Sequence, residues 1–308
     1  MLKINGKTIT GVVYKGKRIE RIMVGGKKYY DMYDGKISGN AVEAGRISID
    51  GKTYSYGAGY FELNIGELSG SSLNSVFSGK KIRTITHIGI DTRRMTDVQQ
   101  MFNNCSSLTE LNLHGFNTQN VTNMYRMFEG SSNLTNLDFG DKFDTQNVTS
   151  MQNMFNNCRS LTSLDVSGFD TRNVTSMQNM FNNCISLTSL DVSNFNTQNV
   201  TNMQNMFWSC SSLTTLNLGN EFDASKVTLV SNMFSGCSLL KTITGSIKNL
   251  SISLSLSVCP LDHDSAMRII NGLATVTTAQ TLALSSTTKA TLSEAEKAIV
   301  IRKGWTLA

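Results

Sequence analysis

Three kinds of side chain in this sequence could do chemistry: histidines, cysteines and carboxylates. The histidines are His87, His114 and His263, and the last lies between Asp262 and Asp264 in the segment LDHDS. That arrangement could form a proton relay, but the segment directly precedes an expected helix, where acidic capping residues are ordinary. The sequence contains no H-E-x-x-H, no G-x-S-x-G and no phosphate-binding loop. We therefore expect no catalytic residue, no cofactor and no enzyme activity.

The cysteines follow a repeat. Five of the six lie three residues after the phenylalanine of a Met-Phe pair, and these are Cys105, Cys158, Cys184, Cys210 and Cys237. Ser131 takes this position in one copy, and Cys259 falls outside the series. Because the chain has no C-x-x-C pair, a zinc site is not expected. An evenly repeated small apolar residue is typical of a core, so buried free thiols are favoured over the alternative, disulfides between stacked cysteines.

Carboxylates and amides form a second series, on the outward side of the expected strands. They define a candidate ligand face: Glu110, Asn112, His114, Asp138, Asp165, Asp191 and Asn217. Carboxylates stacked about 5 Å apart repel by somewhat under 1 kcal/mol for each neighbour in water, so a cation or a basic partner could bind them. Screening by solvent, with serine hydroxyls donating hydrogen bonds, is the simpler explanation. No aromatic residue occupies these positions, which weakens the case for sugar binding or a protein hot spot.

An internal repeat of 26 or 27 residues must position all of these side chains. A Met-Phe pair marks each copy, and its phenylalanines are the predicted structural core: Phe102, Phe128, Phe155, Phe181, Phe207 and Phe234. Each copy joins a segment of period two, such as Ser160–Ser167, to a segment of helical spacing, such as Val174–Phe181. Thr175, three residues before Gln178, indicates a capping box for the second segment. Neither segment can bury its apolar side alone, so the copies must stack around a shared core.

The repeated residues also carry a family resemblance. The pattern L-x-x-L-x-[LV] followed by F-[DN]-T-x-N-V-T-x-M-x-x-M-F-x-x-C resembles the 26-residue repeat of bacterial surface proteins, a branch of leucine-rich repeats related to the BspA type. Similar repeats occur in phage structural proteins. The resemblance covers a little over half of the chain and implies a right-handed α/β solenoid used for adhesion or assembly, without catalytic residues. The predicted fold class is therefore a leucine-rich-repeat α/β solenoid of short parallel strands and short helices, preceded by a small β module.

Three regions are expected. Residues 1–70 read as an N-terminal β module for docking or capping, 71–245 as the solenoid and 246–308 as a C-terminal capping region. In the first, Asp50-Gly51 predicts a hairpin. Residues 1–36 hold nine Lys or Arg against three Asp or Glu, but these lysines lie beside glycines and favour solvated hairpin tips over nucleic-acid binding, with 27–30 (KKYY) a weak exception.

The third region alternates between strand and helix patterns. We expect a strand at Ser251–Ser257, a helix at Asp262–Ala274 capped by Asp262 or Asp264, a strand in TLALSS and a helix at Ser293–Gly304. Trp305 and Leu307 should then return to cover apolar surface. This arrangement is expected to close the last copy of the repeat.

The leading functional hypothesis is a non-enzymatic structural and binding protein of a phage virion, of tail or fibre type. The chain has no run of 18 apolar residues, so no membrane span is expected, and its first residues lack the apolar core of an export signal. Expected partners are other structural proteins of the particle, through the N-terminal module, and a host surface receptor or glycan; a homo-oligomer is also compatible. The alternative is a bacterial cell-surface adhesin. Trp208, which replaces the usual Asn after Met206-Phe207, is a candidate contact residue.

Overall fold

The computed structural model describes residues 2–4, 7–9, 12–14, 17–22, 30–32 and 34–308, with side chains from Asp34 onward. The first five of these segments form strands β1 (Leu2–Ile4), β2 (Lys7–Ile9), β3 (Val12–Tyr14), β4 (Lys17–Ile22) and β5 (Tyr30–Met32). β1 pairs with β2, while β3, β4 and β5 form a second antiparallel sheet. Lys27, Lys28 and Tyr29 lie outside the described residues, so the interpretation of this basic segment stays a prediction.

Strands on both sides of residue 70 share one sheet, whose order is β12-β11-β10-β6-β9. It includes β6 (Lys36–Ala41), β9 (Gly59–Asn64) and β10 (Ile82–Ile88). Between β6 and β9, β7 (Gly45–Ile49) and β8 (Lys52–Tyr56) form the hairpin predicted at Asp50-Gly51, which is confirmed. Asp50 and Gly51 have φ values of 53° and 75°, because a type I′ turn requires positive φ at both central residues.

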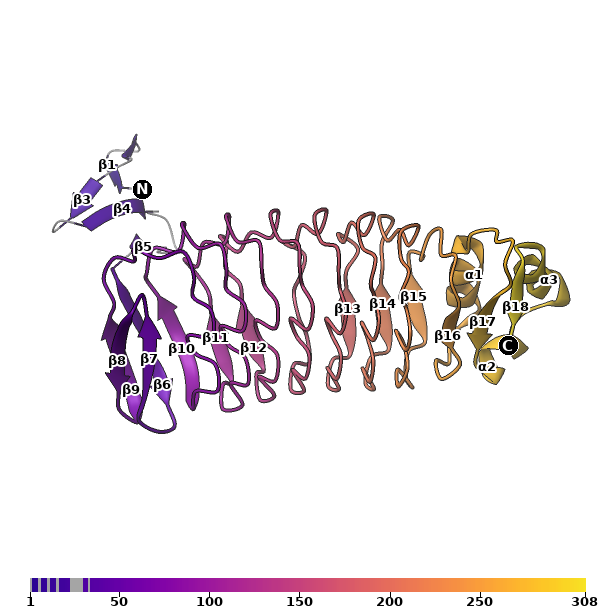
Figure 1. The fold of residues 1–308 in the computed structure, drawn as a ribbon, viewed down its shortest axis with the longest axis horizontal. Helices are drawn as coiled ribbons and strands as arrows, with labels where there is room; N and C mark the ends of the chain where they lie inside the picture. Colours follow the sequence, from indigo (N-terminus) through magenta and orange to yellow (C-terminus); the bar gives the residue numbers. More distant parts are fainter. Residues whose placement is uncertain (1, 5–6, 10–11, 15–16, 23–29, 33) are drawn as a thin grey trace.

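The repeated copies each contribute one short parallel strand at most. These strands are β11 (Glu110–Asn112), β12 (Asn136–Asp138), β13 (Ser189–Asp191), β14 (Thr215–Asn217) and β15 (Thr242–Thr244). β10, β11 and β12 pair in parallel, as do β13, β14 and β15. Residues 163–165, which occupy the same place in the intervening copy, form no strand. Figure 1 shows the copies side by side along the long axis of the molecule.

The Met-Phe segment of each copy is a series of turns. In the copy at 174–183, Asn179 and Asn183 have φ values of 55° and 57°, in the left-handed region that interrupts a right-handed helix. The amide of Phe181 donates to the carbonyl of Met206 in the next copy (2.9 Å), where a helix would require Met177. The amide of Met180 bonds back only three residues, to Met177 (3.1 Å). The amides of this segment therefore alternate: one bonds within its own turn, and the next bonds to the neighbouring copy.

The predicted fold class, an α/β leucine-rich-repeat solenoid with one short helix per copy, is therefore wrong. Small parallel and mixed β-sheets predominate, and the helices of the described residues all lie near the C-terminus. The capping box predicted at Thr175 and Gln178 is also wrong. The Thr175 hydroxyl donates to the carbonyl of Thr149 (3.3 Å), and the Gln178 amide donates to the hydroxyl of Ser176 (3.4 Å).

The C-terminal region contains true helices between short strands. Its elements are β16 (Leu254–Leu256), α1 (His263–Gly272), β17 (Gln280–Leu284), α2 (Ser286–Ala290), α3 (Glu294–Arg302) and β18 (Trp305–Leu307). Asp262 caps α1 by accepting from the Ser265 amide (2.9 Å), and Ser293 forms a capping box with Glu296 in α3. These strands and the helices α1 and α3 confirm the sequence pattern, whereas α2 was not predicted.

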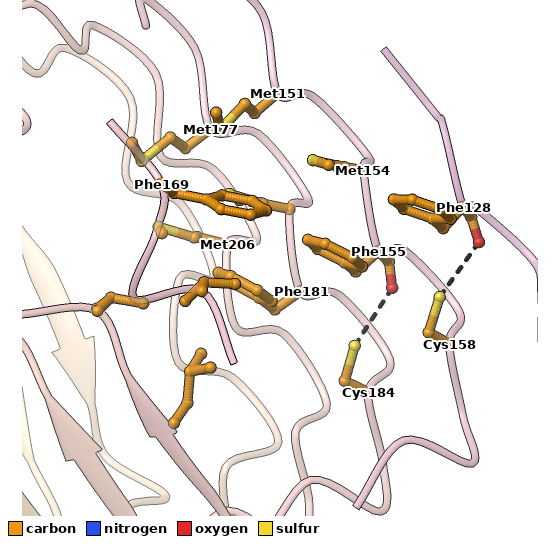
Figure 2. Close-up of a cluster of buried hydrophobic side chains, with 14 of the residues drawn as sticks. Phe128, Met151, Met154, Phe155, Cys158, Phe169, Met177, Phe181, Cys184 and Met206 are labelled. Atoms are coloured by element: carbon orange, nitrogen blue, oxygen red, sulfur yellow. Dashed lines mark hydrogen bonds between the residues drawn. The ribbon is translucent and has the colours of Figure 1, made fainter. Parts of the chain in front are cut away.

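A column of stacked phenylalanines forms the centre of the repeated region. The rings of Phe102, Phe128, Phe155, Phe181, Phe207 and Phe234 are fully buried. Successive ring centroids in this series lie 5.4–5.8 Å apart, with nearly parallel planes. Figure 2 shows three of these rings in a row, with methionines of the same copies beside them. The copies thus share one apolar interior, because each ring before the last, Phe234, is covered by rings of the copies before and after it.

Candidate functional site

The candidate ligand face lies on the strand side of the copies. Its central column consists of Asn112, Asp138, Asp165, Asp191 and Asn217. In every member, the side-chain Oδ1 accepts a hydrogen bond from the backbone amide two residues later, at 2.8–3.1 Å. This is the side-chain turn that Asx residues form at the end of a strand. Four members of the column therefore end a strand, Asp165 makes the same turn in the copy without one, and the turns hold the carboxylates in a fixed orientation.

These turns also explain how exposed carboxylates can repeat in one column. Hydrogen bonds from the Ser167 hydroxyl and amide lower the pKa of Asp165, and those from Ser193 lower the pKa of Asp191 in the same way. Both carboxylates are exposed to solvent. They are therefore ionised at neutral pH and stabilised by local donors, as the simpler explanation of this series expected.

The structure connects only some of the predicted face residues. His114 Nε2 lies 2.9 Å from Asp138 Oδ2, which links two neighbouring copies. Asn217 donates from Nδ2 to Asp191 Oδ2 (3.1 Å). Asp165 bonds only to the amide and hydroxyl of Ser167 within the described residues, and Glu110 is exposed at the start of β11. The face consequently contains two bonded pairs, His114 with Asp138 and Asp191 with Asn217, and Asp165 lies between these pairs.

The column has no metal-binding geometry. Among the residues that the structure describes, no group of three or more His, Cys, Asp or Glu side chains could hold a metal ion. What the face offers is a row of oriented hydrogen-bond acceptors that carry negative charge at three successive copies.

The cysteine series has a structural role that the sequence did not reveal. Each thiol donates to the carbonyl of the equivalent phenylalanine in the preceding copy, for example Cys158 to Phe128 and Cys184 to Phe155, both at 3.2 Å (Figure 2). For Cys105 this residue is Phe77, which follows a valine. The Ser131 hydroxyl makes the same bond to Phe102 (2.7 Å), so the position requires a small donor. Cys259 joins the series as well, since its Sγ lies 3.8 Å from the carbonyl oxygen of Phe234.

All six cysteines are buried and free, which confirms the prediction. Burial raises the pKa of Cys105 and of Cys237 to about 12. A thiol with such a pKa is almost entirely protonated at neutral pH, so it is a poor nucleophile and a poor metal ligand. The series therefore stabilises the stack.

His263 connects two helices. Its Nε2 lies 2.9 Å from Glu296 Oε1 in α3, and its Nδ1 lies 3.3 Å from Asp264. Hydrogen bonds to Asp264 and then Glu296 raise the pKa of His263. Asp262 faces the Ser265 amide as a helix cap, so the three residues of LDHDS form no relay. This arrangement fixes α1 against α3.

A family model described as "Mycoplasma protein of unknown function, DUF285" matches residues 71–164 and 134–247, which together span more than half of the chain. The chain belongs to the DUF285 family. This is loosely consistent with the resemblance to BspA-type surface repeats, and the family description assigns no activity. No curated protein matches the chain. Within the described part of this DUF285 protein, no helix is long and apolar enough to cross a membrane.

The N-V-T sequence of the DUF285 repeat also has a structural explanation. Asn147 donates from Nδ2 to the carbonyl of Gln119 (2.7 Å), and Thr149 donates from its hydroxyl to the carbonyl of Thr122 (3.2 Å). Asn173 repeats the first bond with Gln146. Both polar side chains thus bind the backbone of the preceding copy. Their strict recurrence was the signal that sequence reasoning could have used.

Exposed apolar residues gather in the second half of the array. Trp208, the predicted contact candidate, is 37% exposed, and Ile185, Leu229 and Leu239 are 37%, 46% and 53% exposed. The positions equivalent to Trp208 in earlier copies carry polar side chains, for example Asn103. The exterior is therefore not uniform, although the interior repeats closely.

Proposed function

We propose that this DUF285 protein is a non-enzymatic binding protein that presents the strand side of its stacked copies to a partner with basic groups. The observation that carries the proposal is the column Asp138, Asp165 and Asp191, in which each carboxylate is oriented by the amide two residues later at 2.9 Å. Acceptors that are already ordered lose little entropy on binding. A complementary row of positive charge would gain from all three, because attraction to the partner replaces repulsion within the column.

The chain itself supplies the variant that tests this proposal. Asn112 and Asn217 occupy the same column and make the same turn through Oδ1. Replacing Asp138, Asp165 and Asp191 by Asn should therefore remove three negative charges and keep every turn. A matched control replaces Asp144, Asp170 and Asp223 by Asn, at another repeat position where Asn117 and Asn196 already form such turns.

The measurement is binding of the fluorescently labelled full chain to intact bacterial cells, as a function of salt. The wild-type protein and the control variant should bind equally, with binding that weakens as ionic strength rises. The column variant should bind at least about tenfold more weakly, since close charge pairs across an interface are commonly worth more than 1.4 kcal/mol. Equal binding by all three proteins, or no binding by the wild type, would refute the proposal.

We propose two settings for this protein, a bacterial surface or a phage particle. The family description, which names a bacterial genus, favours the cellular setting over the virion that the sequence first suggested. Immunogold labelling of intact cells and of purified phage particles with an antibody to residues 246–308 separates the two. Gold on cells supports an adhesin, gold on particles supports a virion component, and label on neither excludes a surface role.

A further inference from the structure

One copy interrupts the pairing on the strand side of the stack. In its neighbours, the amide that follows each strand donates to the next copy: Leu113 to Asp138 (2.8 Å), Val192 to Asn217 (2.9 Å) and Leu218 to Thr244 (2.8 Å). Within the described residues, no backbone hydrogen bond joins 136–139 to 163–166, or 163–166 to 189–192. On the β13 side, the amide of Thr188 still donates to the carbonyl of Thr162 (3.3 Å), and Asn194 Nδ2 donates to the carbonyl of Val166 (3.0 Å). Residues 163–166 form no strand, so the row of strands is interrupted between β12 and β13, and it is open on the side that faces β12 (Figure 1).

The turn side of the same copies stays bonded. The amide of Phe128 donates to Met154 (3.0 Å), and the amide of Phe155 donates to Met180 (2.9 Å). The Phe128, Phe155 and Phe181 rings also keep their stacking across this point. Bonds that persist on one side and are absent on the other are the geometry of a hinge, because rotation about the bonded side changes only the open side.

A single bulky side chain accounts for the opening. Phe139 stands where the other copies have leucine or valine, namely Leu113, Val166, Val192 and Leu218. Its ring lies 4.6 Å from that of Phe143 and 5.1 Å from that of Phe169, between centroids. Phe139 is only partly buried, whereas those four aliphatic side chains are buried, which indicates that the ring is too large for this space. Overpacking of this kind shifts the backbone, which is our explanation for the missing bonds.

The extra residue in this copy is not the cause. The copy that contains Leu218 has the same extra residue and the same left-handed glycine, with φ of 66° at Gly219 against 68° at Gly140. Its strand, β14, nevertheless pairs on both sides, with β13 and β15. These two copies share the insertion and differ at the residue that follows the strand, Phe139 or Leu218.

The opening also uncovers apolar side chains. Leu137 and Leu164 are only partly buried, whereas the equivalent Leu111, Leu190 and Leu216 are 2%, 3% and 0% exposed. Incomplete burial and missing backbone bonds both lower the free energy needed for local opening. The interruption is thus the weakest point on the strand side.

We infer that residues 163–166 form a hinge, held open by Phe139, about which the sheets β10–β12 and β13–β15 change their relative angle. Asp138, Asp165 and Asp191 lie on and beside this hinge, so bending alters the spacing of the three carboxylates. A partner that binds the column would then select one angle. This last consequence rests on the proposed function, whereas the hinge itself does not.

Amide exchange of the full chain, resolved by NMR, tests the opening without any partner. The amides of Leu113, Val192 and Leu218 should be protected, and those of Phe139 and Val166 should exchange at least about tenfold faster. Phe139→Leu, which copies Leu218, should protect residues 139 and 166. Leu218→Phe is the reciprocal variant and should expose its own amide. Equal protection of Phe139, Val166 and Leu113 in the wild-type chain would overturn the inference whatever the variants do.

Bending itself is measured by electron–electron distance distributions between spin labels. One pair, Glu110→Cys with Ser189→Cys, spans the hinge, and the other, Ser189→Cys with Thr242→Cys, lies within one paired sheet. The hinge pair should give the broader distribution in the wild-type background, and Phe139→Leu should narrow it to the width of the control pair. Equal widths in the wild-type background would contradict the hinge, even if binding to cells were confirmed.

Discussion

Two segments of this chain have the same apolar spacing and different structures. Residues 174–181 place Val174, Met177, Met180 and Phe181 in the core, with the spacing of one helix face. Helix α1 buries Ala266, Ile269 and Ile270 with a similar spacing. Only α1 bonds its amides four residues back, because the turn segment contains left-handed Asn179 and directs the Phe181 amide to the next copy. Apolar spacing thus reports which side chains are buried, and backbone bonding must be inferred from other residues.

The largest effect should come from the shared column. Phe181→Ala should cost about 3–5 kcal/mol of unfolding free energy, because the ring is fully buried between Phe155 and Phe207. Asp165→Asn, on the exposed face, should change it by less than about 0.5 kcal/mol. Denaturant unfolding monitored by circular dichroism provides both values. Similar losses would mean that the inward and outward assignments are wrong.

Residues with positive φ in the turn segments offer a sharper test of whether these segments are turns or helices. Asn232 is exposed with φ of 58°, so Asn232→Val should cost about 1–2 kcal/mol, while Asn232→Gly should be nearly neutral. In α1 the exposed Arg268 is a matched site for glycine, and Arg268→Gly should cost about 1 kcal/mol. Thermal melts of the three variants decide the matter. A glycine penalty at 232 equal to that at 268 would argue for a helix in both segments.

The thiol series should tolerate serine better than alanine. Cys184→Ser keeps a donor to the Phe155 carbonyl, as Ser131 provides one to the Phe102 carbonyl, whereas Cys184→Ala should lower the free energy of unfolding by about 1 kcal/mol.

Native cysteines should also resist alkylation at neutral pH, because burial raises the pKa of Cys105 and Cys237 to about 12. Mass spectrometry after iodoacetamide treatment checks this second point. Rapid labelling of the native chain would contradict the burial of the series.

The smallest effect concerns pH and the contact between α1 and α3. Because the pKa of His263 is raised above its ordinary 6.5, its contribution to stability is complete below that value and is lost as pH rises through the folded-state pKa. Hydrogen bonds from the Ser293 amide and hydroxyl, and then from His263, lower the pKa of Glu296, so its contribution is lost only as pH falls through the lowered value. His263→Gln should therefore flatten the decline in melting temperature above about pH 6.5. An unchanged pH profile would show that the pair contributes nothing.

Much of the interior could be predicted from the sequence, since burial follows from recurrence at a fixed interval. The stacked phenylalanines, the Asp50-Gly51 hairpin and helices α1 and α3 all carry strong local patterns. The turn segments could not be recognised from spacing alone, because a left-handed asparagine leaves the apolar period unchanged. The effect of Phe139 depends on neighbouring copies, and no local pattern reports it.

The sequence predicted the positions of the candidate site, but it did not predict the hydrogen bonds that orient its side chains. The column of Asp and Asn was evident from the repeat, yet its turns were missed. The available signal was an aspartate at the end of the expected strand, such as Asp165. An aspartate side chain often accepts a hydrogen bond from the backbone amide two residues later in the sequence, here that of Ser167. Cys259 was placed outside the cysteine series, since its interval differs, although its thiol faces the carbonyl of Phe234.

Scalar coupling across hydrogen bonds tests the central claim most directly, because it identifies the acceptor of a single amide. Each copy is held to the next by amides that a helix would have used internally. In a uniformly ¹⁵N- and ¹³C-labelled chain, the nitrogen of Phe181 should couple to the carbonyl carbon of Met206 in the following copy. Coupling of Phe181 to the carbonyl carbon of Met177 would instead establish a helix and contradict the account.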